Sequence, residues 1–421
     1  MPPPGWYDAG LAHIWLPYAQ MKTAAPPPAV ARTQGTRITL ADGRELVDGI
    51  ASWWTACHGY NHPAIRQAVE RQLATMPHVM FAGLVHEQAL TLAARLAKLL
   101  PEDLDRVFFT EFGSVSVEVA LKMAAQYWLN RGVKSRCRFL AFHGGYHGDT
   151  LATMAISDSA MHGAYRDLFP AGHLIADLPR DEELAAALDA LLRSHAGEIA
   201  GIVVEPVVQG AGGMRFHEAA TLRRLRTAAD RYETLLIFDE IFTGFGRTGS
   251  MFACLGASVT PDIVTLSKAL TGGTLPLAAT VARAKIFEAF WSNDPAKALM
   301  HGPTYMANAL ACAAANASLD LFERERTLAN IPVIEAGLMR GLAPCRDFPG
   351  VIDVRVRGAI GVVELAAIND LEKLRARFVE AGAFIRPFGT IVYLTPALNI
   401  AAEDLDFLTG TIVNTLRAGW S

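Results

Sequence analysis

Short, continuously apolar runs alternate with helical patterns through the middle of the chain, and this rhythm limits the folds open to it. The runs GIVVE (201–205) and TLLIF (234–238) contain long apolar stretches without polar alternation, which is typical of strands covered by helices on both faces. Amphipathic stretches such as VEVALKMAAQYWLN (117–130) lie between such runs. The sequence therefore predicts an α/β fold with a mixed, mostly parallel central sheet and a smaller α+β domain.

The two ends of the chain depart from this rhythm. Near the N-terminus, RITLADGRELVDG (37–49) predicts a hairpin that turns at Asp42-Gly43. Towards the C-terminus, Ala-rich helical sequence is followed by the strand-like segments VIDVRVRG (351–358) and IGVVEL (360–365). The expected parts are an N-terminal arm with part of the small domain (1–55), a large ligand-binding domain (56–310) and a C-terminal small domain (311–421).

Composition excludes several functional classes. A net charge of -4 and a pI near 6.3, with scattered Lys and Arg, leave no basic field for nucleic acid. The chain contains no signal-like N-terminus and no apolar stretch near the roughly 20 residues of a membrane helix. Five cysteines, far apart and without a C-x-x-C pair, do not suggest a disulfide framework or a zinc ribbon. We expect a soluble protein of the reducing cytoplasm.

The apolar content also bears on assembly. Hydrophobic residues make up 51% of the chain, charged residues only 19%, and the mean hydropathy is +0.22. A monomer would expose much of this apolar surface to water, so we expect a buried subunit interface and an oligomer.

Two charged residues stand where predicted strands end. Asp239 follows the run TLLIF, and Lys268 follows IVTLS (263–267) as the only cation between Arg247 and Arg283. A partly desolvated ammonium has a lowered pKa and becomes available as a nucleophilic amine. The alternatives are an aspartate that caps the next turn and a surface lysine, although the apolar and Gly-rich flanks of Lys268 weaken the second.

Two earlier loops supply complementary chemistry. Gly113-Ser114 lies between a predicted strand and a helix, where free backbone N–H groups can bind an anion such as phosphate. The segment HGGYHGDT (143–150) brings Tyr146 and Asp149 to the end of another strand. A phosphate cradle, a stacking ring, an acid for a heterocyclic nitrogen and an amine for an aldehyde together predict pyridoxal 5'-phosphate as cofactor.

Longer motifs around these residues carry a family resemblance. They are FFTEFGSVSVEVALKMA, HGGYHGDT, EPVVQGAGGM, IFDEIFTGFGRTG, LSKALTGGTLPLAAT and HGPTYMAN. From about residue 13 to 400 the chain resembles the class III aminotransferases of PLP fold type I. The segments WLPYAQM, SWWTACHGYNHP and RPFGTIVYLTP are similar to the subfamily that aminates 7-keto-8-aminopelargonate with S-adenosylmethionine during biotin synthesis. The resemblance implies a homodimer with shared active sites.

The same resemblance implies roles for matched residues. Those expected to hold the cofactor are Gly113, Ser114, Tyr146, Asp239, Lys268 and, from the neighbouring subunit, Pro303 and Thr304. Those expected to line the substrate site are Tyr18, Trp53, Tyr146, Lys268, Gly302 and Arg386. Lys268 would attach the cofactor, Asp239 would keep the pyridine nitrogen protonated, and Tyr146 would stack on the ring. Arg386 would pair with the carboxylate of the oxo acid. No metal ion is implied, and Asp149 and Arg247 match the motifs without a defined role.

Two positions depart from the patterns of relatives. Glu111-Phe112 precedes Gly113 where the family usually has Asp-Ser. The sequence therefore predicts the phosphate site but not the shape of its loop. Ala211 stands in QGAGG where relatives that use glutamate often carry a glutamate. Glutamate therefore fits less well as donor, while S-adenosylmethionine and lysine both stay open.

Several features have competing interpretations. GFGRTG (244–249) matches a dinucleotide-binding pattern, which makes a nicotinamide-dependent oxidoreductase the alternative function, but it neither begins at a strand end nor opens into a good helix. The pairs His58/His62 and His143/His147 have metal-like spacing, yet glycines interrupt both. Trp53-Trp54 is a core pair if the family resemblance is set aside, and Glu205 is either structural or a ligand. Decarboxylase or mutase chemistry would use the same cofactor residues.

Overall fold

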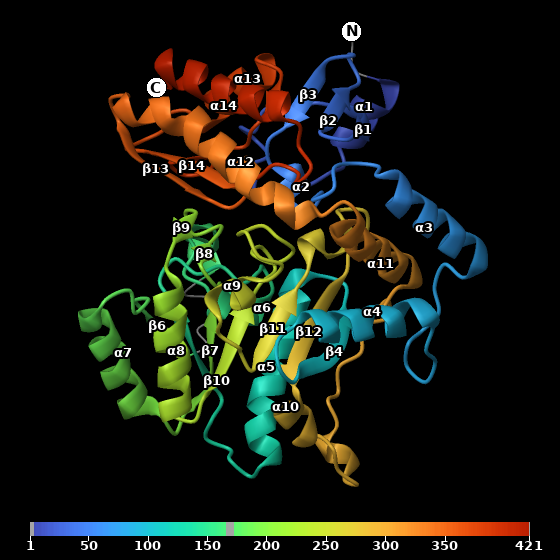
Figure 1. The fold of residues 1–421 in the computed structure, drawn as a ribbon, viewed down its shortest axis with the longest axis vertical. Coiled ribbons are helices and arrows are strands. Elements are labelled where there is room, and N and C mark those ends of the chain that lie inside the picture. Colours follow the sequence, from blue (N-terminus) through green and yellow to red (C-terminus); the bar gives the residue numbers. More distant parts are fainter. Residues whose placement is uncertain (1–3, 166–171, 421) are drawn as a thin grey trace. The chain divides into compact units, whose positions relative to one another are not determined.

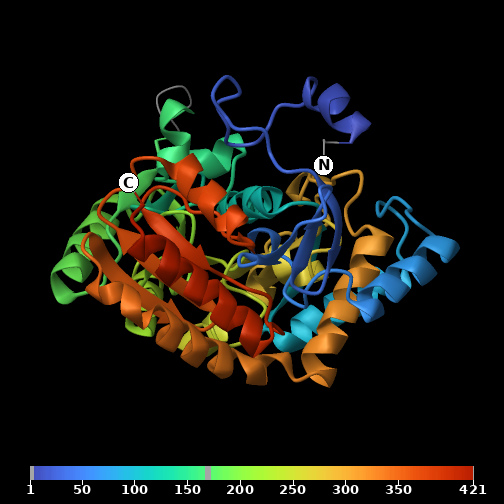
Figure 2. The ribbon, with the colours of Figure 1, turned by 90° about the horizontal axis from the view of Figure 1, so that it is seen from above.

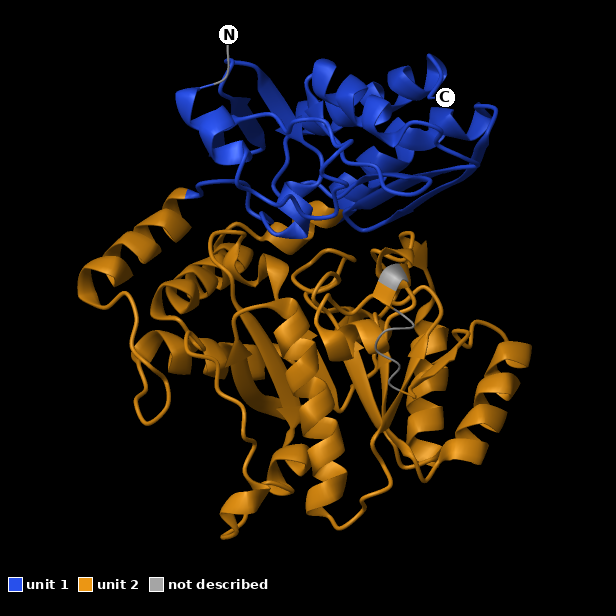
Figure 3. Cartoon of the chain, turned by 180° about the vertical axis from the view of Figure 1, so that it is seen from behind, with its two compact units in different colours: residues 1–62, 332–421 blue, residues 63–331 orange. Residues whose placement is uncertain are grey.

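The structure is a computed structural model that describes residues 4–165 and 172–420. The chain divides into two compact units (Figure 3), which we call the large unit (63–331) and the small unit (1–62 with 332–421). The contacts thus divide the chain after residues 62 and 331. The sequence-based domain boundaries after residues 55 and 310 stay a prediction.

A mixed sheet forms the centre of the large unit (Figure 1). Its strands are, in spatial order, β4 (Leu104–Thr110), β12 (Ala278–Arg283), β11 (Ile263–Leu266), β10 (Leu235–Asp239), β7 (Ile199–Val204), β5 (Arg138–Phe142) and β6 (Leu174–Ala176). β12 is antiparallel to both of its neighbours, and the other pairs are parallel. The predicted mixed, mostly parallel sheet is confirmed.

The large unit also contains helices. They are α3 (Pro63–Thr75), α4 (Glu87–Leu99), α5 (Gly113–Asn130), α6 (Leu151–Ala155), η1 (Ala160–Tyr165), α7 (Glu182–His195), α8 (Ala219–Arg231), α9 (Ala253–Ala257), η2 (Lys268–Thr271), α10 (Ala284–Glu288), η3 (Pro295–Lys297) and α11 (Ala309–Arg324). A short ribbon pairs β8 (Val208–Gln209) with β9 (Arg215–Phe216). β7, β10 and β11 are buried along their whole length, as their apolar sequences require.

The core of the large unit lies between α5 and the sheet. Val117, Ala120 and Ala124 of α5 belong to one buried cluster with Ile237 and Ile263 of the central strands. This packing fixes the start of α5 relative to the strand ends, where the site residues lie. Asp181 and Asn308 cap α7 and α11 by accepting hydrogen bonds from first-turn N–H groups.

The small unit contains two sheets. One has the order β1 (Val30–Gln34), β2 (Arg37–Leu40), β3 (Glu45–Asp48) and β15 (Ala383–Phe384); the other has the order β13 (Val351–Arg357), β14 (Ile360–Leu365) and β16 (Ile391–Leu394). The helices of this part of the chain are α1 (Gly5–Leu11), α2 (Ala51–Trp54), η4 (Ala343–Asp347), α13 (Leu371–Glu380) and α14 (Ala402–Arg417), and α12 (Thr327–Leu342) crosses the boundary between the two units. α13 and α14 lie side by side (Figure 2).

The predicted hairpin is confirmed. β2 and β3 pair antiparallel, and Gly43 in the turn between them has a φ of 92°, a backbone conformation that glycine adopts without strain. The strands predicted at 351–358 and 360–365 are β13 and β14. Within residues 4–165 and 172–420, no helix has both the length and the apolar character required to span a membrane.

Candidate active site

Asp239 and Lys268 lie at the same edge of the large-unit sheet. β10 and β11 are parallel neighbours, with Asp239 opposite Thr265, and η2 begins at Lys268 just beyond β11. Because the carboxyl ends of parallel strands open to ligands at one edge, the carboxylate and the amine share that edge. Lys268 has a φ of 45°, a strained value that is concentrated at functional sites in proteins.

Burial determines the protonation of Lys268. It lowers the pKa of the lysine to about 8, although the negative charges of Asp239, Glu205 and Asp149 act in the opposite direction. The Nζ atom lies 5.8 Å from the centre of the Phe242 ring. An amine with this pKa has a far larger neutral fraction near physiological pH than an ordinary lysine, and the neutral form is the one that acts as nucleophile or general base.

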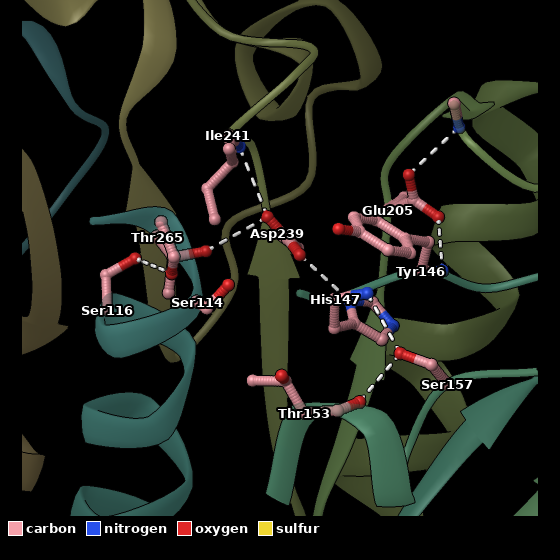
Figure 4. A network of polar contacts seen from close by, with 12 residues as sticks. Ser114, Ser116, Tyr146, His147, Thr153, Ser157, Glu205, Asp239, Ile241 and Thr265 are labelled. Atoms are coloured by element: carbon pink, nitrogen blue, oxygen red, sulfur yellow. Dashed lines mark hydrogen bonds and ion pairs between the residues drawn. The ribbon is translucent and has the colours of Figure 1, made fainter. Parts of the chain in front are cut away.

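Asp239 is buried and held by three donors (Figure 4). One carboxylate oxygen, Oδ2, lies 2.8 Å from Nδ1 of His147. The other, Oδ1, accepts hydrogen bonds from the Thr265 hydroxyl and the Ile241 backbone N–H, both at 3.2 Å. These contacts fix the orientation of the carboxylate, so that it can hold a proton on a ligand nitrogen.

His147 is the buried partner of Asp239. Burial disfavours the charged imidazolium, but the hydrogen bond to Asp239 and its negative charge outweigh this effect and raise the pKa of His147. The other member of the spaced pair, His143, lies 2.9 Å from Oδ2 of Asp158. The two histidines therefore contact different carboxylates, and nowhere in the described chain do three or more His, Cys, Asp or Glu side chains gather as metal ligands would.

Glu205 connects two loops at the end of β7. Its Oε2 accepts a hydrogen bond from the Tyr146 backbone N–H at 3.0 Å, and its Oε1 accepts one from Gly210 at 2.9 Å (Figure 4). Burial raises the pKa of Glu205 to about 7. Of the two interpretations left open by the sequence, these contacts favour the structural one.

Tyr146 belongs to a compact polar group. Its hydroxyl donates to Oδ1 of Asp149 at 2.9 Å, and Nε2 of His162 lies at the same distance from the same oxygen. The rings of Tyr146 and His162 are stacked, with 5.4 Å between their centres and 27° between their planes. His162 was not predicted from the sequence, because η1 returns to the Tyr146 loop only in three dimensions.

The start of α5 lies against the Tyr146 loop. Phe112, which precedes the helix, has no side-chain acceptor with which to cap the first-turn N–H groups. The Asp149 backbone N–H donates to the Ser114 hydroxyl at 3.2 Å. A Cβ atom on Gly148 would come within 2.2 Å of that hydroxyl oxygen. The structure thus brings the predicted anion site, Gly113-Ser114, together with the loop that carries the stacking ring.

Residues 302–304 lie on a more exposed loop. Gly302 and Thr304 are exposed and Pro303 is half-buried. The backbone N–H of the next residue, Tyr305, donates to Oε1 of Glu111 at 3.3 Å. Glu111, one of the two positions that depart from the family pattern, therefore connects this loop to the start of α5.

Tyr18, Trp53 and Arg386 form a separate cluster in the small unit. The Arg386 guanidinium lies 4.8 Å from the centre of the Trp53 ring, and the Tyr18 ring meets Trp53 edge-on at 5.9 Å. Burial lowers the pKa of Arg386, and the nearby charge of Arg375 adds to this effect. Trp54 is instead buried against Tyr393, with 6.2 Å between ring centres. The core interpretation therefore holds for Trp54 and not for the exposed Trp53.

The backbone that carries Trp53 is strained. Ala51, Ser52, Trp53 and Trp54 have φ values of 46°, 51°, 56° and 72°, so α2 is a left-handed turn. Residues other than glycine adopt this conformation at a cost of roughly 1–2 kcal/mol each. Nothing in the sequence ASWW indicates it, since none of these residues favours the left-handed region.

The chemistry of the large-unit site fits pyridoxal phosphate. One sheet edge brings together uncapped N–H groups at a helix start, an aromatic ring, a buried carboxylate and an amine of lowered pKa. By contrast, GFGRTG lies in turns, beginning five residues after β10 ends at Asp239 and preceding the short helix α9. It does not form the strand-to-helix loop that a dinucleotide site requires.

A family model described as "Aminotransferase class-III" matches residues 18–416. The chain belongs to the class III aminotransferases. This membership rules against the nicotinamide oxidoreductase alternative. Among class III aminotransferases, the adenosylmethionine-8-amino-7-oxononanoate aminotransferase of Mycobacterium leprae (strain TN) is 44% identical over 412 residues, which cover 96% of this chain and 94% of the relative. The enzyme of the same name from Buchnera aphidicola subsp. Acyrthosiphon pisum (strain APS) is 42% identical and covers 96% of each chain.

Solved structures of class III aminotransferases share the fold. The adenosylmethionine-8-amino-7-oxononanoate aminotransferase of Methanocaldococcus jannaschii DSM 2661 has a TM-score of 0.93 at 30% identity, over 98% of both chains. A PLP-bound amine transaminase from an uncultivated Pseudomonas species has a TM-score of 0.88 at 30% identity, over 97% of this chain and 99% of that chain. The predicted fold class, fold type I, is confirmed.

Proposed function

We propose that this chain transfers an amino group from S-adenosylmethionine to 7-keto-8-aminopelargonate, which yields 7,8-diaminopelargonate for biotin synthesis. The proposal is carried by the amine of Lys268, with its pKa lowered to about 8, at the same sheet edge as the buried carboxylate of Asp239. The names of the relatives support the choice of substrates.

The cofactor of this reaction is pyridoxal 5'-phosphate. Its phosphate would bind the N–H groups at Gly113 and Ser114, and its ring would lie on Tyr146 with the nitrogen at Asp239 and the aldehyde at Lys268. When bound, it supplies an electron sink that makes the α-carbon proton of an amino acid acidic enough to leave.

The protein supplies proton transfer and fixed charge. The Nζ atom of Lys268 would accept the proton from the α-carbon of the donor and deliver it to the carbon that was the cofactor's aldehyde, and with the acceptor it would carry out the same transfer in reverse, so one residue acts as general base and general acid. The carboxylate of Asp239 would keep a proton on the ring nitrogen of the bound cofactor, where it would stabilise developing negative charge. His147, whose pKa is raised, holds that carboxylate in place.

The cluster of Tyr18, Trp53 and Arg386 in the small unit would bind the substrates. The faces of Trp53 and Tyr18 suit both the sulfonium of the donor, through cation–π attraction of roughly 0.5–2 kcal/mol, and the aliphatic chain of the acceptor. Arg386 would bind the carboxylate of the acceptor through two parallel hydrogen bonds. Gly302 of the large unit is also expected to contact a substrate.

The assembly is a homodimer whose subunits complete each other's sites. The exposure of the 302–304 loop supports this proposal, since Pro303 and Thr304 are then available to the phosphate site of a neighbouring subunit. Exposed apolar side chains of the large unit, including Met80 and Val85, supply a surface that a partner would cover.

The donor half-reaction tests the proposed function. The cofactor-loaded protein is mixed singly with S-adenosylmethionine, lysine or glutamate, without an acceptor, and the visible absorbance of the cofactor is followed. We expect S-adenosylmethionine alone to convert the cofactor to its amine form, and Lys268→Ala to abolish the conversion while the cofactor still binds. Conversion by lysine or glutamate but not by S-adenosylmethionine would contradict the proposed donor.

A further inference from the structure

Asp48, at the end of β3, contacts the left-handed turn that carries Trp53. Its carboxylate is buried; Oδ1 accepts a hydrogen bond from the Ile50 backbone N–H, and Oδ2 accepts one from Ser52, both at 2.8 Å. The Tyr60 hydroxyl donates to the same Oδ2 at 2.5 Å. The two backbone donors stand at the entry to the turn, so the carboxylate stabilises the conformation in which Trp53 is exposed.

Tyr60 is itself fixed by the backbone. Its N–H donates to the Gly35 carbonyl at 2.7 Å, and its carbonyl accepts from the Gly35 N–H at 3.0 Å. The neighbouring Gly59 approaches the same strand connection so closely that a Cβ atom there would lie 2.8 Å from the Gly35 oxygen. The position of the Tyr60 hydroxyl is thus set by backbone contacts outside the left-handed turn.

The strand register connects Asp48 with Arg386, which packs on Trp53. β3 pairs with β15 in parallel, with Asp48 opposite Phe384, and the Gly49 N–H donates to the Phe384 carbonyl at 3.0 Å. Arg386 follows two residues after Phe384 and places its guanidinium over the Trp53 ring. The same sheet edge therefore sets the position of the turn and of the cation that packs on its tryptophan.

The strained backbone of residues 51–54 is also the segment that the hydrogen bonds to Asp48 stabilise. Four successive left-handed residues would relax to right-handed geometry if nothing held them, and the direction of each side chain would change with the backbone. The packed cluster of Tyr18, Trp53 and Arg386 would then lose its shared tryptophan. Two hydrogen bonds to the carboxylate from backbone N–H groups and one from a phenol oppose this relaxation.

We propose that Asp48 and Tyr60 are positioning residues for substrate binding: together they hold the left-handed turn so that Trp53 stays packed with Arg386 and Tyr18 in the substrate-binding cluster. The inference rests on the proposed function and adds to it, because neither residue contacts the substrate in our assignment. Their effect is exerted through Trp53, and this dependence can be measured.

The test uses Tyr60→Phe, which removes one hydroxyl and keeps the ring and the backbone bridge to Gly35. We expect the variant to raise the KM for S-adenosylmethionine by roughly 3- to 10-fold, the range of a lost hydrogen bond, with kcat changed less than two-fold or so. Tyr232→Phe is the matched control, since its hydroxyl donates to the Asp189 carbonyl at 3.2 Å, outside the site. Its KM should equal that of the wild type.

A double-mutant cycle with Trp53→Ala decides whether the effect runs through the tryptophan. If Tyr60 acts by positioning Trp53, adding Tyr60→Phe to Trp53→Ala should leave KM unchanged. Equal effects of Tyr60→Phe in both backgrounds, or no effect in the wild-type background, would overturn the inference. Asp48→Asn should act in the same direction and more strongly, and Tyr60→Phe keeps the test decisive if Asp48→Asn fails to fold.

A second readout does not depend on turnover. Binding of S-adenosylmethionine, which keeps the sulfonium that Trp53 is proposed to attract, is measured by calorimetry for each variant in a Lys268→Ala background, in which no amino group is transferred. We expect the same pattern of affinities, with Tyr60→Phe weakening binding only when Trp53 is present. Failure of the proposed function would leave the wild type without transamination by S-adenosylmethionine, whereas failure of this inference would leave the wild type active and the cycle additive.

Discussion

At the scale of single residues, the site depends on two groups whose surroundings change their chemistry. Burial lowers the pKa of Lys268 to about 8. The hydrogen bonds of Asp239 with His147, Thr265 and Ile241 hold its carboxylate in one orientation. The fold thus sets the pKa of the amine and the orientation of the carboxylate without a ligand. A site that is preorganised in this way needs little reorganisation during the reaction.

The pH dependence of cofactor attachment follows from the lowered pKa. Lys268 reacts only as the neutral amine, so the attachment rate should rise with pH, reach half of its maximum near about 8 and level off above. Absorbance of the cofactor-free protein mixed with pyridoxal phosphate, across roughly pH 6 to 10, measures the rate; an ordinary lysine would give a midpoint near about 10.4 instead. Lys98→Ala serves as the control and should leave the profile unchanged, whereas a midpoint above about 10 in the wild type would contradict the assignment.

At the scale of elements, the site is made where helix starts and strand-end loops meet. The Tyr146 loop crosses the first turn of α5 so closely that residue 148 has space for no side chain, and Gly148 has a φ of 122°. The Asp149 N–H bond to Ser114 joins the same two elements. The phosphate site and the stacking ring therefore cannot move independently.

Gly148→Ala tests this coupling between elements. The added Cβ would come within 2.9 Å of the Ser114 Cα as well as within 2.2 Å of its hydroxyl oxygen, so the loop or the helix start has to shift. Overpacking of this kind typically costs about 1–3 kcal/mol, and we expect cofactor affinity to fall roughly 10-fold or more. Equilibrium dialysis measures it. Gly197→Ala, where a Cβ meets nothing within 4 Å, is the control; equal affinities for the two variants would show that the elements are not coupled.

At the scale of the whole molecule, the proposed function includes a second subunit that completes the site. Apolar side chains stand exposed on the segment around α3 and α4, including Met80 at 59% and Val85 at 64% exposure. The 302–304 loop, from which Pro303 and Thr304 would reach a neighbour, is also exposed in part. Both observations agree with the low charge content of the chain, which already favours an interface.

Charges placed on this surface should weaken the dimer. We expect Met80→Asp with Val85→Asp to raise the dimer dissociation constant roughly 100-fold, because a buried carboxylate without a partner opposes association. Sedimentation velocity measures the constant, and loss of cofactor affinity should accompany dissociation. Leu129→Asp, at an exposed position near the end of α5, should not change assembly. A monomeric wild type, or equal dissociation constants for both variants, would contradict the proposal.

The sequence by itself determined the α/β fold, the mostly parallel sheet and the residues at its strand ends. Continuous apolar runs indicate strands that are buried on both faces, and the residue after such a run must lie at the sheet edge. The positions of Asp239 and Lys268 at that edge could therefore be predicted from the local pattern alone. The hairpin at Asp42-Gly43 followed in the same way, because the turn requires a backbone conformation that glycine supplies.

Only the tertiary structure decided the partners of these residues. His147 meets Asp239, His162 stacks on Tyr146, and Asp48 supports the turn of Trp53 through contacts that no spacing in the sequence predicts. The left-handed conformation of ASWW is the clearest case: intrinsic preferences of its residues oppose it, and the hydrogen bonds at its entry go to Asp48, a buried carboxylate that lies outside the segment and also accepts from Tyr60. The local sequence pattern indicates burial and turns. Strained backbone and paired side chains depend on segments that are far apart in the sequence and that only folding brings together.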